Sequence, residues 1–249
     1  EDVAVDNHAM NGRSSLSFIN EGRWDAVLAK LKKGDYVFIQ FGHNDSSVEK
    51  KDRYTSPEDY RANLLRMIDE VKAKGGNPVL CTPVARRKFD NDAKLVDMHG
   101  VYPDIVREVA KTKRVPMIDM QKYTSEWLAA EGVSASRQYF HKYAAGQNPL
   151  YPKGLDDNTH FVEKGARKVA SFFVNGIKEN NVSGLTKLLK ENQLILDVYI
   201  DKYSIELFIN HGEKVFSFTS FSDDKGNEFS LSSEKKAVIN HAEINHINV

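Results

Sequence analysis

Short apolar runs alternate with longer stretches of helical periodicity over the first 180 residues, and this alternation constrains the fold more than any other feature. The runs Tyr36–Phe41 and Pro78–Val84 are almost continuously apolar, which is typical of strands buried on both faces. Between them, Ser56 and Pro57 suit the cap and first position of a helix that Gly75 ends. This alternation predicts an α/β domain whose parallel sheet is covered by helices on both faces.

The same pattern predicts the remaining elements of this domain. We expect, in chain order, a short strand at Val3–Val5, a helix at Phe18–Leu31, a helix near Tyr102–Thr112, a strand at Val115–Met120, a helix at Gln121–Glu131, a long loop at Val133–Thr159 and a last helix at Val162–Lys178. Because ligands bind beyond the carboxyl ends of strands in open α/β sheets, the site is expected in the loops that follow the strands.

The periodicity changes after the α/β part. Residues 181–193 are typical of a linker, and from residue 194 apolar and polar residues alternate with period two, with "NHGE" as a turn between two runs. The chain is therefore predicted to consist of an α/β domain at residues 1–180, a linker and a small antiparallel β segment at residues 194–249.

Composition excludes several classes of protein. Lysine plus arginine equals aspartate plus glutamate, 35 each, so no long-range field favours nucleic acid or an anionic membrane. No apolar stretch approaches the length of about 18 residues that a spanning helix needs. Cys81 is the only cysteine, which excludes an intramolecular disulfide, and its apolar surroundings predict a buried, inert thiol.

Polar residues gather in three clusters that are candidates for chemistry. The first is Asn7, His8, Gly12, Arg13 and Ser14, the second is Gly42–Asp45 directly after a predicted strand, and the third is Asp156–Phe161.

In the third cluster, Asp157 and His160 are three residues apart, so on a turn or first helical turn their side chains can share a face. A carboxylate that holds one imidazole nitrogen fixes the tautomer and leaves the other nitrogen as a general base. Asp156 could fill the same role, and a helix cap beside an exposed histidine is the alternative interpretation.

In the second cluster, the Asn44 amide could donate to an oxyanion without titrating, although an ordinary strand-to-loop turn explains the same residues. His43 and Asp45 lack further ligands at persuasive spacing, so no metal is expected. Gly12 could present its backbone N–H to the same site. Ser14 and Ser15 suit helix capping better than nucleophilic attack.

Together and in this order, the blocks "NHAMNGRSS", "EGRW", "GDYVFIQFGHND", "TPVARRKF" and "DNTHF" resemble the SGNH, or GDSL-type, hydrolases. They look most like the rhamnogalacturonan acetylesterase branch, carbohydrate esterase family 12, over Val3–Glu179. The resemblance implies a flavodoxin-like three-layer fold and a serine esterase that removes acetyl groups from pectin, a plant cell-wall polysaccharide. It also implies no cofactor and an extracellular or periplasmic location.

Site residues carry over from the resemblance one by one. It implies that Gly12 and Asn44 form the oxyanion hole, that His160 is the general base and that Asp157 orients it. Three neighbours, His43, Asp45 and Arg13, are expected to line the substrate site. The family's nucleophilic serine lies in a "GDS" block after the first strand, and this sequence contains no such tripeptide. We therefore expect an N-terminally truncated chain that lacks its first strand and is inactive alone.

The C-terminal segment resembles part of the C-terminal β-sandwich of glycoside hydrolase family 32, through Asp201, Ser204, Glu206, Phe208, Asn210, Gly212 and Glu213. The catalytic domain of that family is absent from the match, so fructan cleavage is not assigned. A carbohydrate O-acetylesterase is the leading hypothesis. The alternatives are a non-catalytic carbohydrate-binding or structural fragment and an accessory fragment of a fructan-active glycoside hydrolase. No nucleic-acid or membrane partner is expected, and the oligomeric state stays open.

Overall fold

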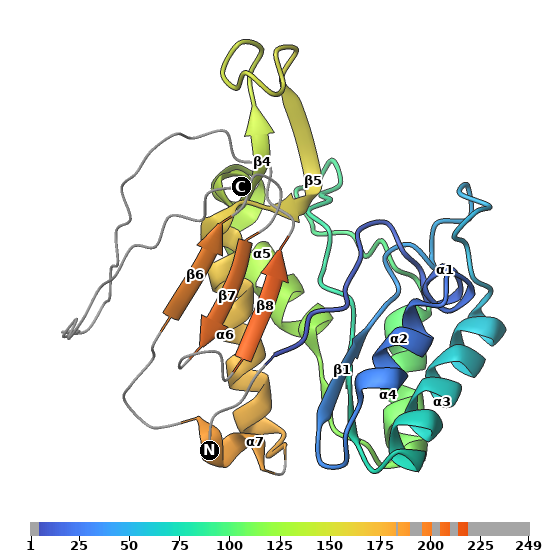
Figure 1. Ribbon diagram of the computed structural model, residues 1–249. Coiled ribbons are helices and arrows are strands. Elements are labelled where there is room, and N and C mark those ends of the chain that lie inside the picture. The colour runs from blue at the N-terminus through green and yellow to red at the C-terminus, as the bar shows by residue number, and fades with distance from the viewer. Residues whose placement is uncertain (1–4, 183, 190–195, 201–204, 210–213, 219–249) are drawn as a thin grey trace.

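A parallel sheet forms the centre of the α/β part in this computed structural model, which describes residues 5–182, 184–189, 196–200, 205–209 and 214–218 (Figure 1). The strands β1 (Tyr36–Gln40), β2 (Asn77–Cys81) and β3 (Met117–Ile118) lie in the order β1-β2-β3 and are all parallel. The predicted α/β class with a parallel sheet is confirmed.

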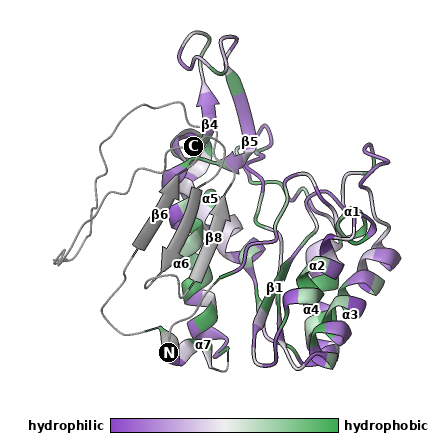
Figure 2. Cartoon of the chain, viewed as in Figure 1, coloured by the Kyte–Doolittle hydropathy of each residue, from purple (hydrophilic) through white to green (hydrophobic). Residues whose placement is uncertain are grey.

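Helices cover both faces of this sheet and create two hydrophobic cores (Figure 1). One face carries α1 (Ser15–Asn20), α2 (Arg23–Lys30), α3 (Pro57–Ala73) and α4 (Tyr102–Lys113), and the other carries α5 (Met120–Ala135) and α6 (Glu163–Glu179), after which comes the short α7 (Leu185–Leu188). Successive β2 side chains point to opposite faces, so Leu80 packs in the first core while Val79 and Cys81 pack in the second. β1 is largely hydrophobic, and the outward side of α3 is hydrophilic (Figure 2).

The thiol of Cys81 is buried, as predicted. Cys81 is 2% exposed, and burial raises its pKa to about 12, so it stays protonated and inert.

Two predicted elements are wrong. The expected helix at Phe18–Leu31 is two helices, because Gly22 adopts a left-handed backbone conformation with φ of 70° between them. The expected loop at Val133–Thr159 contains a 3-10 helix (Ser136–Tyr139) and a hairpin of β4 (Phe140–Tyr143) and β5 (Leu155–Phe161). The Asp156–Phe161 cluster consequently lies on a strand of this hairpin (Figure 1).

β1 is the edge strand of the described sheet, and its Phe38 is 39% exposed. The strand expected at Val3–Val5 falls mostly on residues outside the described ones, and Val5 itself is not in a strand. None of the described helices is long and apolar enough to cross a membrane.

The predicted antiparallel β segment is present. Its strands β6 (Leu196–Ile200), β7 (Ile205–Ile209) and β8 (Lys214–Phe218) pair antiparallel in chain order. Most residues that carry its resemblance, Asp201, Ser204, Asn210, Gly212 and Glu213, lie outside the described residues. The boundaries of the linker and of the two predicted domains stay a prediction.

Candidate active site

The carboxyl ends of the parallel strands meet at one edge of the sheet, where Gln40 of β1 is in register with Cys81 of β2. The chain leaves β1 through Gly42, whose φ of 125° is left-handed. A Cβ at this position would lie 3.0 Å from Pro83 Cγ on the loop that follows β2. Glycine therefore permits both the turn and the close approach of the two loops.

Asp45 fixes this turn from within the protein. Its Oδ1 accepts hydrogen bonds from the Ser15 backbone N–H at 2.9 Å and the Ser15 hydroxyl at 2.6 Å, and its Oδ2 accepts from the Gly42 N–H at 3.0 Å. Burial raises the pKa of the carboxyl although these hydrogen bonds oppose the change. Since the side chain is fully buried, Asp45 shapes the loop from behind, and a direct contact with substrate is not favoured.

The structure brings the first and second clusters together through Asn44. Its Nδ2 donates to the Arg13 carbonyl at 3.0 Å, next to Gly12, which has a left-handed φ of 76°. Arg13 directs its Nε to both carboxylate oxygens of Glu21 at 3.0 Å. The assignments of Gly12 and Asn44 to an oxyanion hole, and of Arg13 to the substrate, stay predictions.

The hydroxyls of Ser14 and Ser15 form hydrogen bonds within the protein. Ser14 caps α1 in a capping box with Ser17, as predicted. Ser15 donates its hydroxyl to Asp45 and accepts from Asn63 Nδ2 at 3.0 Å. Neither hydroxyl is oriented as a nucleophile.

Asp157 and His160 form a hydrogen-bonded pair on β5. His160 Nδ1 lies 2.7 Å from Asp157 Oδ2, and Asp157 Oδ1 accepts from the backbone N–H groups of Thr159 at 2.6 Å and His160 at 2.9 Å. The backbone thus turns locally around the carboxylate, which brings the two side chains onto one side. Asp156 instead is exposed and pairs with Lys142, so the choice that the sequence left open falls on Asp157.

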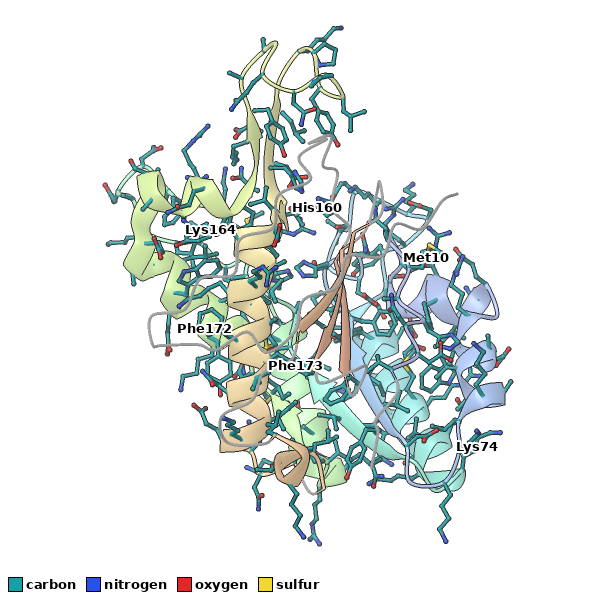
Figure 3. The ribbon with its side chains drawn as sticks, turned by 60° about the vertical axis from the view of Figure 1, so that its left-hand side comes forward. Met10, Lys74, His160, Lys164, Phe172 and Phe173 are labelled. Atoms are coloured by element: carbon teal, nitrogen blue, oxygen red, sulfur yellow. The ribbon has the colours of Figure 1, made fainter. Side chains whose placement is uncertain are left out.

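This pair has the electrostatics of an orienting carboxylate and a base. Burial would raise the pKa of Asp157, but the hydrogen bonds from the His160 side chain and from the two backbone amides lower it overall, so the carboxylate stays ionised. An ionised carboxylate accepts the Nδ1 proton, which leaves Nε2 as the proton acceptor. The His160 side chain is 38% exposed, and in Figure 3 it lies in the upper half of the view, as Met10 does, whereas Lys74 lies near the bottom.

His43 contacts a buried histidine, His99, that lies outside the three clusters. Its Nδ1 lies 2.9 Å from His99 Nε2, and its ring packs edge-on against the His99 ring. Burial, followed by the charges of His99, Arg86 and His160, lowers the pKa of His43 well below its usual value. Burial also lowers the pKa of His99 to about 4. Both rings are therefore neutral at pH 7, and contact of His43 with substrate stays a prediction.

Sequence reasoning missed three side chains that organise the site: His99 and two adjacent arginines. Arg86 Nη2 donates to the His43 carbonyl at 2.8 Å. Arg87 holds Asn158, the residue after Asp157, through its backbone N–H and its Nη1, both at 2.9 Å. No local pattern could have found these contacts, because 43 residues separate Arg86 from His43 and 71 separate Arg87 from Asn158.

The described residues contain no group of three or more histidine, cysteine, aspartate and glutamate side chains that could hold a metal ion. The chemistry that they offer is acid–base catalysis by His160 together with neutral hydrogen-bond donors at the sheet edge.

Comparison with known proteins identifies relatives of the whole α/β part. The GDSL-like Lipase/Acylhydrolase family matches residues 1–168, and the family described as Glycosyl hydrolases family 32 C terminal matches residues 154–249. The rhamnogalacturonan acetylesterase RhgT of Bacillus subtilis is 41% identical over 180 residues, which cover 72% of this chain and 76% of that protein.

Two further proteins of Bacillus subtilis are similar. The probable rhamnogalacturonan acetylesterase YesY is 34% identical over 195 residues, which cover 77% of this chain and 84% of that protein. The crystal structure of YxiM superimposes with a TM-score of 0.60 at 25% identity, over 72% of this chain and 47% of that one.

Proposed function

We propose, from the premise that this chain belongs to the GDSL-like lipase/acylhydrolase family, that it acts in the hydrolysis of O-acetyl esters on a carbohydrate, with rhamnogalacturonan as the polymer. The observation that carries the proposal is the 2.7 Å contact between His160 Nδ1 and Asp157 Oδ2, and the charge of His160 acts on His43, the residue before Asn44. An ester hydrolase needs a base, a group that orients the base, and neutral donors for an oxyanion.

Each group has a step in this reaction. His160 Nε2 takes the proton of a serine hydroxyl as the oxygen attacks the acetyl carbonyl, and Asp157 stabilises the resulting imidazolium. The amide of Asn44 and the backbone N–H of Gly12 donate to the oxyanion. His160 then returns the proton to the sugar hydroxyl that leaves, and water releases acetate by the same groups.

The attacking serine of this reaction stays a prediction, because the sequence contains no Gly-Asp-Ser tripeptide. Ser14 and Ser15 use their hydroxyls in the cap of α1 and in the bond to Asp45. We expect the serine on a strand that pairs with the edge of β1 opposite β2, to which no described strand is hydrogen-bonded, in a Gly-Asp-Ser block of the family type. A polymeric substrate further favours action outside the cytoplasm, in an extracellular or periplasmic location.

An acetate-release assay on acetylated rhamnogalacturonan tests the proposal. The chain should be compared with a form extended at its N-terminus by a Gly-Asp-Ser segment, and with the same form carrying His160→Ala. We expect release by the extended form, and at least a 100-fold slower rate for His160→Ala. An inactive extended form, or an active His160→Ala variant, would contradict the proposed function. Comparable turnover by the chain alone would refute the expected need for the extra segment.

A further inference from the structure

Two adjacent arginines at the site differ in how they use their donors. Arg87 donates from every nitrogen: Nε to Ser136 Oγ at 2.8 Å, Nη1 to Asn158 Oδ1 at 2.9 Å, and Nη2 to the Val133 carbonyl. The Arg86 side chain makes one hydrogen bond among the described residues, from Nη2 to the His43 carbonyl. Its Nε is fully buried and has no acceptor among the described residues. Buried donors are satisfied in most native proteins, so this orphan donor calls for an explanation.

The charge of Arg86 is also unpaired. In the part of the chain that the structure describes, no carboxylate oxygen lies within ion-pair distance of Arg86, whereas Arg13, Arg53 and Arg107 each have a carboxylate partner. Burial lowers the pKa of Arg86, and the carboxylates of Glu49 and Asp157 act on it only from a distance. The guanidinium nevertheless stays charged, because its ordinary pKa is far above 7.

Asp157, one of the two carboxylates that act on the charge of Arg86, is hydrogen-bonded to other groups. Asp157 uses Oδ2 for His160 and Oδ1 for two backbone amides, and it forms no ion pair with Arg86 among the described residues. A half-buried cation that lacks an anion within the protein is stabilised when an anion binds to it. Arginine is suited to a carboxylate in particular, since its planar fork matches both oxygens.

Arg86 lies where it can contact the sugar that carries the ester. Its hydrogen bond to His43 places the guanidinium beside Asn44, the predicted donor to the oxyanion. In a uronic acid, the carboxylate and the acetylated hydroxyls belong to the same ring. A cation next to the reacting ester is therefore within reach of that carboxylate, whereas a neutral sugar such as xylose offers it no anion.

We propose that Arg86 binds the free carboxylate of a uronic acid residue and so selects acetyl esters that lie next to a carboxylate. This inference rests on the proposed function, because it concerns the sugar bound at the same site. Nη2 keeps its hydrogen bond to the His43 carbonyl, and the Nη donors that this bond does not use bind the carboxylate. Arg86 then determines specificity, whereas Arg87 holds neighbouring segments of the protein together through its hydrogen bonds.

Binding measurements on the chain as it stands test this assignment without turnover. Calorimetry should compare a partially O-acetylated oligogalacturonide with the same oligosaccharide after methyl esterification of its carboxylates. We expect the free acid to bind at least about tenfold more tightly, the equivalent of one charge-assisted hydrogen bond. The Arg86→Gln variant should lose this preference, and Arg86→Lys, which keeps the charge without the fork, should retain part of it.

Arg61→Gln is the matched control, because it removes one arginine from α3 that pairs with Glu108 on the surface. It should keep the wild-type preference. Equal binding of both oligosaccharides by the wild-type chain would overturn the inference. An unchanged preference in Arg86→Gln would also overturn it. An equal loss of affinity for both oligosaccharides would overturn it too, because it would mean that Arg86 only holds the loop. If Arg86→Gln does not fold, the wild-type comparison and Arg86→Lys decide.

Failure of this inference is distinguishable from failure of the proposed function. A carboxylate preference without acetate release from the extended form would reject the esterase alone. Acetate release at equal rates from the free acid and its methyl ester would reject the role of Arg86 alone.

Discussion

The buried histidine pair should make the stability of this protein depend on pH in a defined window. His99 has a fully buried side chain, its Nε2 lies 2.9 Å from His43 Nδ1, and its own Nδ1 has no hydrogen bond among the described residues. The groups that face it are His43, the cation of Arg86 and, at 3.8 Å, the carboxylate of Asp97. Burial and the Arg86 charge outweigh the Asp97 carboxylate, so the folded protein resists protonation of His99.

The sign and size follow from the two pKa values. The pKa of His99 is about 4 in the folded protein, against 6.5 for an ordinary histidine. As the pH falls from 6.5 towards 4, the unfolded chain takes up a proton that the folded protein refuses. The stability due to neutral His99 is therefore complete above pH 6.5 and is lost as the pH falls to about 4. At about 1.4 kcal/mol per pKa unit, the loss amounts to about 3 kcal/mol.

Urea denaturation at pH 7, 5.5 and 4.5 measures this loss. The reference is His99→Gln, whose amide can still bond to His43 but does not titrate. The free energy of unfolding of the wild-type chain should fall more steeply between pH 6.5 and pH 4.5 than that of the variant. Parallel curves over this range would refute the reasoning, because they would show that His99 does not resist protonation in the folded state.

Three further changes test other parts of the site. In a form that releases acetate, Asp157→Asn should lower kcat about 100-fold or more with little change in KM, because the imidazole tautomer is no longer fixed; an unchanged kcat would exclude that role. Arg87→Met should lower the free energy of unfolding by about 2–4 kcal/mol in urea, because Asn158 and other buried acceptors lose their donors, and a loss below about 1 kcal/mol would contradict this. Asp45→Asn should cost a similar amount, since a buried acceptor becomes a donor that faces other donors. Its control Asp69→Asn, which breaks an exposed ion pair, should cost less than about 1 kcal/mol, and equal losses for the two variants would be inconsistent with the buried role of Asp45.

Local sequence patterns predicted the sheet and most helices because caps, prolines and apolar periodicity lie within each element. α3 begins at Pro57 after the Ser56 cap, as the sequence indicates. The hairpin was missed because β4 and β5 do not alternate cleanly between apolar and polar residues. Their pairing depends on tertiary contacts, such as Phe140 opposite Phe161, and on the interaction of Lys142 with Asp156.

In the candidate site, too, sequence indicated the features that depend on neighbouring residues and not those that depend on distant contacts. Asp157 and His160 are three residues apart, so spacing and family resemblance could indicate the pair. The contacts of His99, Arg86 and Arg87 join segments that are 43 to 71 residues apart, and no periodicity or motif in one stretch records them. Such contacts follow only from the way the loops after β1 and β2 and the hairpin come together.

The adjacent residues Arg86 and Arg87 connect two of these segments. The predicted oxyanion donor Asn44 follows β1, whereas the predicted base His160 lies on the β4–β5 hairpin, and neither element pairs with the other in a sheet. The loop after β2 joins them, because Arg86 donates to the backbone of His43 and Arg87 donates to Asn158. Neighbouring residues in an ordered loop keep a fixed separation, so the distance between donor and base is set before substrate binds. Preorganisation of this kind lowers the reorganisation required in the transition state. It follows that Arg87 variants should move the base relative to the donor and lower kcat, whereas Arg86 variants should act first on the affinity for the carboxylate.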